Sequence, residues 1–145
     1  MVSFTELNAQ NHKITELSKV LLHIINERSL CDTDVTCDIF FDYTSKVKAH
    51  LDLEERELYS ELLTHSDKEV KATATKFLSG SAEIKHVLKD YLKHWCRNKH
   101  LRIKDHDRFI SDSKDIFDLV NKRISDEVEH FYPMIRELNT TKMVA

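Results

Sequence analysis

Two carboxylates and one histidine occupy positions that should face the interior of a helical protein. His50 and Glu54 are four residues apart, which places both side chains on the same face of a helix. Glu127 interrupts a second apolar stripe in the same way, before Phe131. Because two carboxylates facing each other in a low dielectric repel, a metal ion, a proton or an arginine must compensate them. These residues therefore predict a buried metal site or a buried ion-pair cluster.

Arg123 decides between two interpretations of this cluster. It precedes Glu127 by four residues, so a helix would place both on one face. In the first interpretation, its guanidinium points inward and supplies the positive charge that a metal would otherwise provide, through five donors in a fixed fork. In the second, Arg123 extends to solvent while a metal binds His50, Glu54, Glu127 and a neighbouring residue.

The elements that would position these residues are helices. The chain contains one glycine and one proline, whereas turn-rich β folds need many more. Apolar residues recur at helical spacing in four segments, expected at about 3–29, 34–64, 66–97 and 108–138. Capping boxes at Ser3 and Ser66 should open the first and third segments. Long amphipathic helices with short connections predict an all-α, antiparallel, up-down four-helix bundle.

We expect one domain over residues 1–138 and a flexible tail over 139–145. Gly80 falls inside the third predicted helix and could mark a kink or a break. Pro133 falls near the end of the fourth and should bend it.

A weak internal repeat relates the two halves of the chain. Residues 50–60 align without gaps on residues 123–133, an offset of 123 − 50 = 73 that corresponds to one helix pair. The same offset aligns Asn11 with Ile84 and Tyr59 with Tyr132. We expect the two tyrosines to pack with their hydroxyls near the bundle surface. A two-fold repeat of helix pairs is one way in which bundles arrange metal sites between facing helices.

The segment 50–63 resembles the His-x-x-x-Glu-Glu…Leu-Tyr-Pro motif of hemerythrin-like cation-binding domains. Residues 127–133 resemble its second copy, with the Phe-Tyr-Pro ending intact. The resemblance extends over nearly the whole chain. It implies a bundle that holds non-haem iron, as one or two ions, between its helices. In that family the ligands are one histidine from each of the first and third helices and a His-x-x-x-Glu pair from the second and fourth.

Carried over by position, the family's ligand set is incomplete here. At three of the family's ligand positions this chain has matching residues, His50, Glu54 and Glu127. At the three other positions, where the family has histidines, this chain has Asn11, Ile84 and Arg123. Nearby side chains that a change of register could bring inward are His12, Glu83 and His86.

Two functions remain open at this point. The first is a metal-binding protein that binds or senses iron, oxygen or nitric oxide. The second is a metal-free bundle that acts as a protein-interaction or regulatory module, with Arg123 replacing the metal charge.

Several other classes find no support in the sequence. Net charge is −3 with both signs interspersed, which argues against nucleic-acid and membrane-surface partners. Neither a nucleophile with its base nor a phosphate-binding loop is recognisable, so no enzyme class is indicated. Three cysteines lack disulfide or zinc spacing, and we expect a reducing, cytoplasmic environment: Cys31, Cys37 and Cys96.

Overall fold

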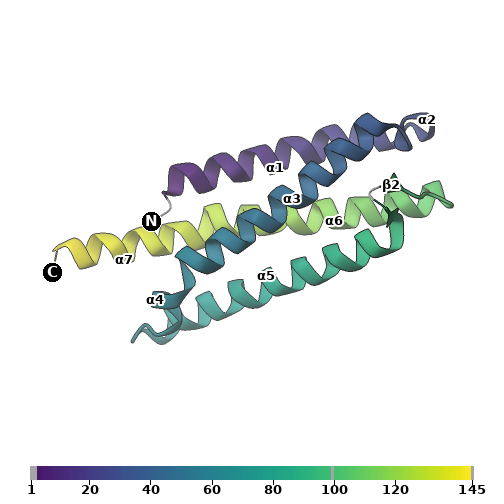
Figure 1. The fold of residues 1–145 in the computed structure, drawn as a ribbon. Helices are drawn as coiled ribbons and strands as arrows, with labels where there is room; N and C mark the ends of the chain where they lie inside the picture. Colours follow the sequence, from purple (N-terminus) through teal and green to yellow (C-terminus); the bar gives the residue numbers. More distant parts are fainter. Residues whose placement is uncertain (1–2, 99, 145) are drawn as a thin grey trace.

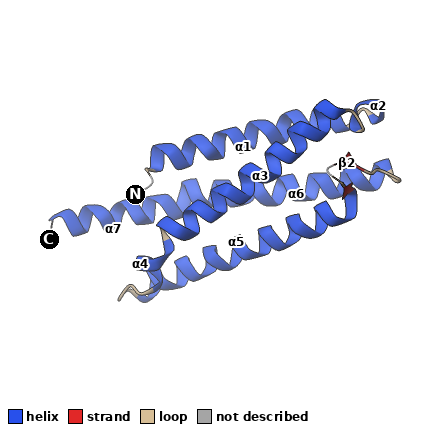
Figure 2. Ribbon diagram, in the orientation of Figure 1, coloured by secondary structure: helices blue, strands red, loops and turns tan. Residues whose placement is uncertain are grey.

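The computed structural model describes residues 3–98 and 100–144, which are almost entirely helical (Figures 1 and 2). The predicted all-α class is confirmed. The helices are α1 (Phe4–Ile25), α2 (Arg28–Cys31), α3 (Asp34–Glu57), α4 (Tyr59–Leu63), α5 (Lys68–Trp95), α6 (His106–Asp126), the π-helical turn η1 (Glu127–Phe131) and α7 (Tyr132–Val144). A short antiparallel hairpin, β1 (Cys96–Arg97) with β2 (His100–Leu101), connects α5 to α6. No helix among the described residues is long and apolar enough to cross a membrane.

The ends of the helices follow the capping chemistry of the sequence, with one correction. Ser3 accepts a hydrogen bond from the backbone N–H of Glu6, as its capping box predicts. The predicted start of the third helix at Ser66 is wrong by one residue. Asp67 caps α5 instead, because its carboxylate accepts from the backbone N–H groups of Glu69 and Val70.

The fourth predicted segment is a helix with a wider turn inside it. The backbone N–H of Tyr132 donates to the carbonyl of Glu127, five residues back, as in a π-helix. Pro133 follows at once; proline has no N–H to donate and clashes with the carbonyl four residues earlier, so an ordinary α-helical turn is disfavoured here. The departure from the regular α-helix expected at Pro133 takes the form of η1. Beyond it, α7 is helical to Val144, within the segment expected to be a flexible tail, and Ala145 lies outside the described residues.

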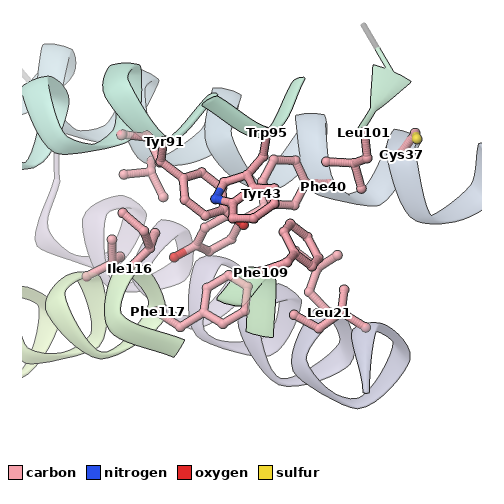
Figure 3. Packing of buried hydrophobic residues seen from close by; sticks show 14 of the residues in the cluster. Leu21, Cys37, Phe40, Tyr43, Tyr91, Trp95, Leu101, Phe109, Ile116 and Phe117 are labelled. Carbon is pink, nitrogen blue, oxygen red and sulfur yellow. The ribbon is translucent and has the colours of Figure 1, made fainter. Parts of the chain in front are cut away.

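Helix α1 packs against α3 and α6, and α5 packs against α6 and α3. The buried apolar residues form two clusters. In the larger, the rings of Tyr43, Trp95, Phe109 and Phe117 converge (Figure 3). The smaller surrounds Phe131 near the other end of the helices.

A polar layer separates the two apolar clusters. On α1, for example, Leu7 belongs to the smaller cluster and Ile14 to the larger, and the buried residue between them is Asn11. The buried ionisable residues at the corresponding level of the other elements are His50 and Glu54 on α3, Arg123 on α6 and Glu127 on η1. The fold thus encloses a small set of ionisable side chains between two apolar layers.

Candidate metal centre

Three side chains place potential ligand atoms close together in the polar layer. Atoms of His50, Glu54 and Glu127 all lie within 4.8 Å of one another. The His50 Nε2 atom is 3.0 Å from Glu127 Oε1 and 3.5 Å from Glu54 Oε1. His50 is 3% exposed, and both glutamates are fully buried. One imidazole and two carboxylates form a donor set suited to iron or another divalent first-row metal.

The orientation of His50 is set by a residue on α1. Its Nδ1 atom lies 2.7 Å from the amide oxygen of Gln10, so Nδ1 carries the proton and donates it to that oxygen. Nε2 therefore faces the two carboxylates and needs a proton or a cation between itself and Glu127. In metal sites the ligating histidine commonly donates its other N–H to a carbonyl or carboxylate in this way. Gln10 was not among the residues that the sequence indicated.

Arg123 lies inside the cluster and is only 8% exposed. Its Nε donates to Glu127 Oε2 over 2.9 Å, and its Nη2 donates to the hydroxyl of Tyr59 over 2.8 Å. Nη1 donates to the backbone carbonyl of Phe77, and the guanidinium carbon lies 4.8 Å from the centre of that ring. The interpretation in which Arg123 extends to solvent is therefore wrong. Each of the three guanidinium nitrogens donates a hydrogen bond to a neighbouring acceptor, which offsets the cost of burying the charge.

The two carboxylates have opposite protonation preferences. Burial raises the pKa of Glu54, and its hydrogen bond to Glu127 and the Glu127 charge raise it further. Burial also acts on Glu127, but hydrogen bonds from His50 and Glu54, with the charges of His50 and Arg123, outweigh it and lower that pKa. Without a metal, Glu54 is therefore neutral while Glu127 is ionised and paired with Arg123. The proton on Glu54 removes the repulsion between the two carboxyl groups, as a bound cation would.

This proton makes the stability of the metal-free protein depend on pH. Between the ordinary glutamate pKa of 4.5 and the raised pKa of Glu54, the folded protein holds a proton that the unfolded chain has lost. The free energy of unfolding should therefore fall as the pH rises from about 5 to 8, by at most about 1.4 kcal/mol per unit. The lowered pKa of Glu127 acts with the opposite sign, and only below this window.

Glu54→Gln should remove this dependence, because the amide is a neutral substitute for the protonated acid. Urea denaturation of chelator-treated protein at about pH 5 and 8 should show that the variant gains stability relative to wild type as the pH rises. Glu57→Gln, an exposed position on the same helix, is the control and should show no such gain. Parallel pH profiles for wild type and Glu54→Gln would contradict the assignment of the proton to Glu54.

The two tyrosines of the repeat contribute their hydroxyls to the cluster. Tyr59 accepts from Arg123, and the Tyr132 hydroxyl lies 2.9 Å from Glu54 Oε2 and 3.0 Å from Glu127 Oε1. Both residues are buried, so the expectation that their hydroxyls lie near the surface is wrong. Each tyrosine thus contacts residues from the opposite half of the repeat.

A shared spacing explains why these hydroxyls reach the cluster. Each tyrosine follows a buried glutamate by five residues, and in an α-helix residues five apart point about 140° away from each other. The chain departs from the α-helix at both places. A break at Leu58 separates α3 from α4 before Tyr59, and the π turn η1 precedes Tyr132. The repeated Glu-x-x-x-x-Tyr spacing, next to a proline in one copy, was the signal available in the sequence.

The remaining candidate residues do not complete a histidine-rich site. Asn11 is buried, and its amide donates to Glu127 Oε1 over 3.3 Å and to the Tyr132 hydroxyl over 3.2 Å. Ile84 is buried in the larger apolar cluster. The expectation that a nearby side chain would turn inward is not met, because the exposed faces of α1 and α5 carry His12, Glu83 and His86.

Gly80 does not kink or break α5, which is continuous from Lys68 to Trp95. A Cβ atom at this position would lie 3.1 Å from the Nη1 atom of Arg123. Glycine is therefore explained by the close approach of the guanidinium, which the Phe77 carbonyl holds in place.

Replacing Gly80 with alanine should consequently fail to give the usual helix stabilisation of about 0.5–1 kcal/mol. The same substitution in an Arg123→Ala background should give that gain, because the obstructing group is gone. Urea denaturation of the four proteins of this double-mutant cycle measures the difference. Ser79→Ala, at the exposed neighbouring position, should have the same effect in both backgrounds. An equal effect of Gly80→Ala in both backgrounds would contradict the close-approach explanation.

Comparison of the chain with models of protein families, with curated proteins and with solved structures gave no match. The resemblance to hemerythrin-like domains therefore depends on the motif residues, and membership of that family is a proposal.

Proposed function

We propose that this chain is a divergent hemerythrin-like, up-down four-helix bundle that binds one non-haem iron, or another divalent metal ion, in its core. His50, Glu54 and Glu127 would hold the ion, and the function would be the binding or sensing of iron, oxygen or nitric oxide. The convergence of three buried ligand atoms carries this proposal. One of these atoms, Glu54 Oε1, has no hydrogen-bond partner although it is fully buried. A buried carboxylate oxygen without a partner is costly, and a cation would remove that cost.

The packing of the helices supports the bundle part of the proposal. Helices α1, α3, α5 and α6 are long and are joined by short connections, and α1 and α5 each pack against both α3 and α6. Short connections favour antiparallel neighbours. The polar layer lies where the metal layer of such a bundle would be, between two apolar clusters.

One ion fits this site better than two. The guanidinium of Arg123 occupies the place of a histidine in the second half of the repeat, and arginine does not bind metals at ordinary pH. Its Nε is hydrogen-bonded to Glu127 Oε2, which leaves Glu127 Oε1 on the side of His50. The positive charge of Arg123 also balances one of the two carboxylates, so a second cation would be left without compensation.

A cavity of about 390 Å³ between α1 and α3 is lined by Gln10 and His50, among others. It offers a route by which an ion or a small molecule could approach His50. An ion held by three side chains keeps open coordination positions, and these would supply the binding of a small diatomic ligand.

The second candidate function is a metal-free protein-interaction or regulatory module. The observation that favours it is the set of hydrogen bonds from Arg123 to Glu127, Tyr59 and the Phe77 carbonyl, of which the first neutralises Glu127 without an ion. Exposed apolar side chains at the α2–α3 end, Leu30 at 43% and Val35 at 66%, would suit a protein partner.

Calorimetric titration of chelator-treated protein with iron(II) under anaerobic conditions tests the proposal. We expect one ion per chain. The double variant Arg123→His, Ile84→His should raise this to two. Each substitution places an imidazole where the hemerythrin-like ligand set has a histidine. Titrations without saturable binding to the wild-type chain would contradict the proposed function and favour the metal-free module. Two ions bound to wild type would contradict the role of Arg123.

A further inference from the structure

The hydroxyl oxygen of Tyr132 lies among the three ligand atoms rather than beside them. It is 2.9 Å from Glu54 Oε2, 3.0 Å from Glu127 Oε1 and 3.5 Å from His50 Nε2. Tyr132 itself is 1% exposed. A phenol oxygen at hydrogen-bonding distance from both carboxylates is within the space that an ion bound to them would occupy.

The Tyr132 hydroxyl has two carboxyl groups as hydrogen-bond partners. Tyr132 has a single O–H group, so it can donate to only one of the two carboxyl groups beside it, Glu54 or Glu127. The amide of Asn11 donates to the same oxygen over 3.2 Å and fixes its position from the α1 side. Glu54 Oε1, in the same space, has no hydrogen-bond partner. One buried carboxyl oxygen beside Tyr132 therefore lacks a hydrogen-bond donor, which is the condition that a cation relieves.

From this arrangement we infer that Tyr132 is a fourth ligand of the proposed ion and binds it as a phenolate. This inference rests on the proposed metal-binding function. Ion binding would break the O–H bonds of Tyr132 and Glu54, displace any proton on His50 Nε2, and release these protons to solvent, with no change of oxidation state. Two carboxylates and one phenolate carry three negative charges, which a divalent ion and the Arg123 guanidinium balance to zero. Three anionic oxygens with one imidazole form a hard ligand set that also suits iron(III).

Tyr59 provides a matched comparison within the same molecule. It occupies the equivalent position in the repeat and is also buried. Its hydroxyl, however, accepts a hydrogen bond from Arg123 over 2.8 Å, so the guanidinium already occupies the side from which an ion would approach. Of these two tyrosines, Tyr132 is the one placed to bind the metal.

The experiment is optical and resonance Raman spectroscopy of the full chain loaded with iron(III), with iron content measured on the same samples. Phenolate bound to iron(III) gives a visible charge-transfer band and enhanced phenolate vibrations. We expect both in wild type and in Tyr59→Phe. Tyr132→Phe should lose the band and bind iron at least about 10-fold more weakly. Ring-deuterated tyrosine should shift the enhanced vibrations of wild type, which tests for a phenolate ligand even if Tyr132→Phe does not fold.

The outcomes separate this inference from the function on which it rests. Stoichiometric iron without a phenolate signature, or a band that persists in Tyr132→Phe, would overturn the assignment of Tyr132 and leave the metal site intact. A band that is lost in Tyr59→Phe but not in Tyr132→Phe would show that Tyr59 is the phenolate ligand and would overturn the assignment of Tyr132. Samples without bound iron would contradict the metal site itself, and the inference with it.

Discussion

Arg123→Ala should lower the free energy of unfolding of the metal-free protein by about 3–5 kcal/mol, the range for a buried ion pair that loses one partner. The substitution leaves Glu127 fully buried without its 2.9 Å hydrogen bond from Nε. It also removes the donors to the Tyr59 hydroxyl and to the Phe77 carbonyl. Glu127 would then compete with Glu54 for one proton, so the repulsion between the carboxylates would add to the loss.

Urea denaturation of chelator-treated protein, followed by circular dichroism, measures this loss. Lys122→Ala is the control at the adjacent position, because the Lys122 side chain is 77% exposed and pairs with Asp126 on the surface. Exposed pairs of this kind contribute about 0–1 kcal/mol. If the two substitutions cost the same, Arg123 is not the charge partner of the buried glutamates.

The second large effect concerns metal binding by His50→Ala. Removing the only imidazole of the cluster should weaken metal binding by more than the roughly 10–100-fold loss seen when an outer-shell partner is removed. The helices should remain, because the two apolar clusters on either side of the polar layer do not include His50. Calorimetric titration with iron(II) measures the affinity, and circular dichroism measures the helix content.

His86→Ala is a closely matched control for this variant. His86 is also followed four residues later by a carboxylate, Asp90, with 3.4 Å between them, but this pair lies on the surface of α5. It should leave the metal affinity unchanged. Equal losses in the two variants would show that iron binds histidines non-specifically, and unchanged affinity in His50→Ala would exclude His50 as a ligand.

The helices could be predicted from the sequence because their signals are local. The scarcity of glycine and proline excludes most other fold classes, and apolar residues at helical spacing locate the long segments. His50, Glu54 and Glu127 were recognisable for a related reason, since each interrupts a stripe that is otherwise apolar. The start of α5, by contrast, was assigned to Ser66 by its capping-box pattern, whereas the side chain of the next residue, Asp67, caps the helix.

The tyrosines were misplaced because their position depends on departures from the regular α-helix. Fixed helical periodicity turns Tyr132 away from Glu127, whereas the π turn beside Pro133 brings them together. Gly80 was misread for a different reason. Its close neighbour, Arg123, is distant in sequence and approaches only when α5 packs on α6. Contacts of that kind follow from tertiary packing, which one sequence does not reveal.

The central claim, that the buried cluster is a metal site, is tested most directly by elemental analysis. The full chain should be expressed with iron supplementation and purified without chelators or a histidine tag. We expect one iron per chain in wild type, and none in His50→Ala prepared in parallel. Wild-type protein without stoichiometric metal of any kind would contradict the claim, and Arg123 and the proton on Glu54 would then be the charge partners of a purely structural cluster.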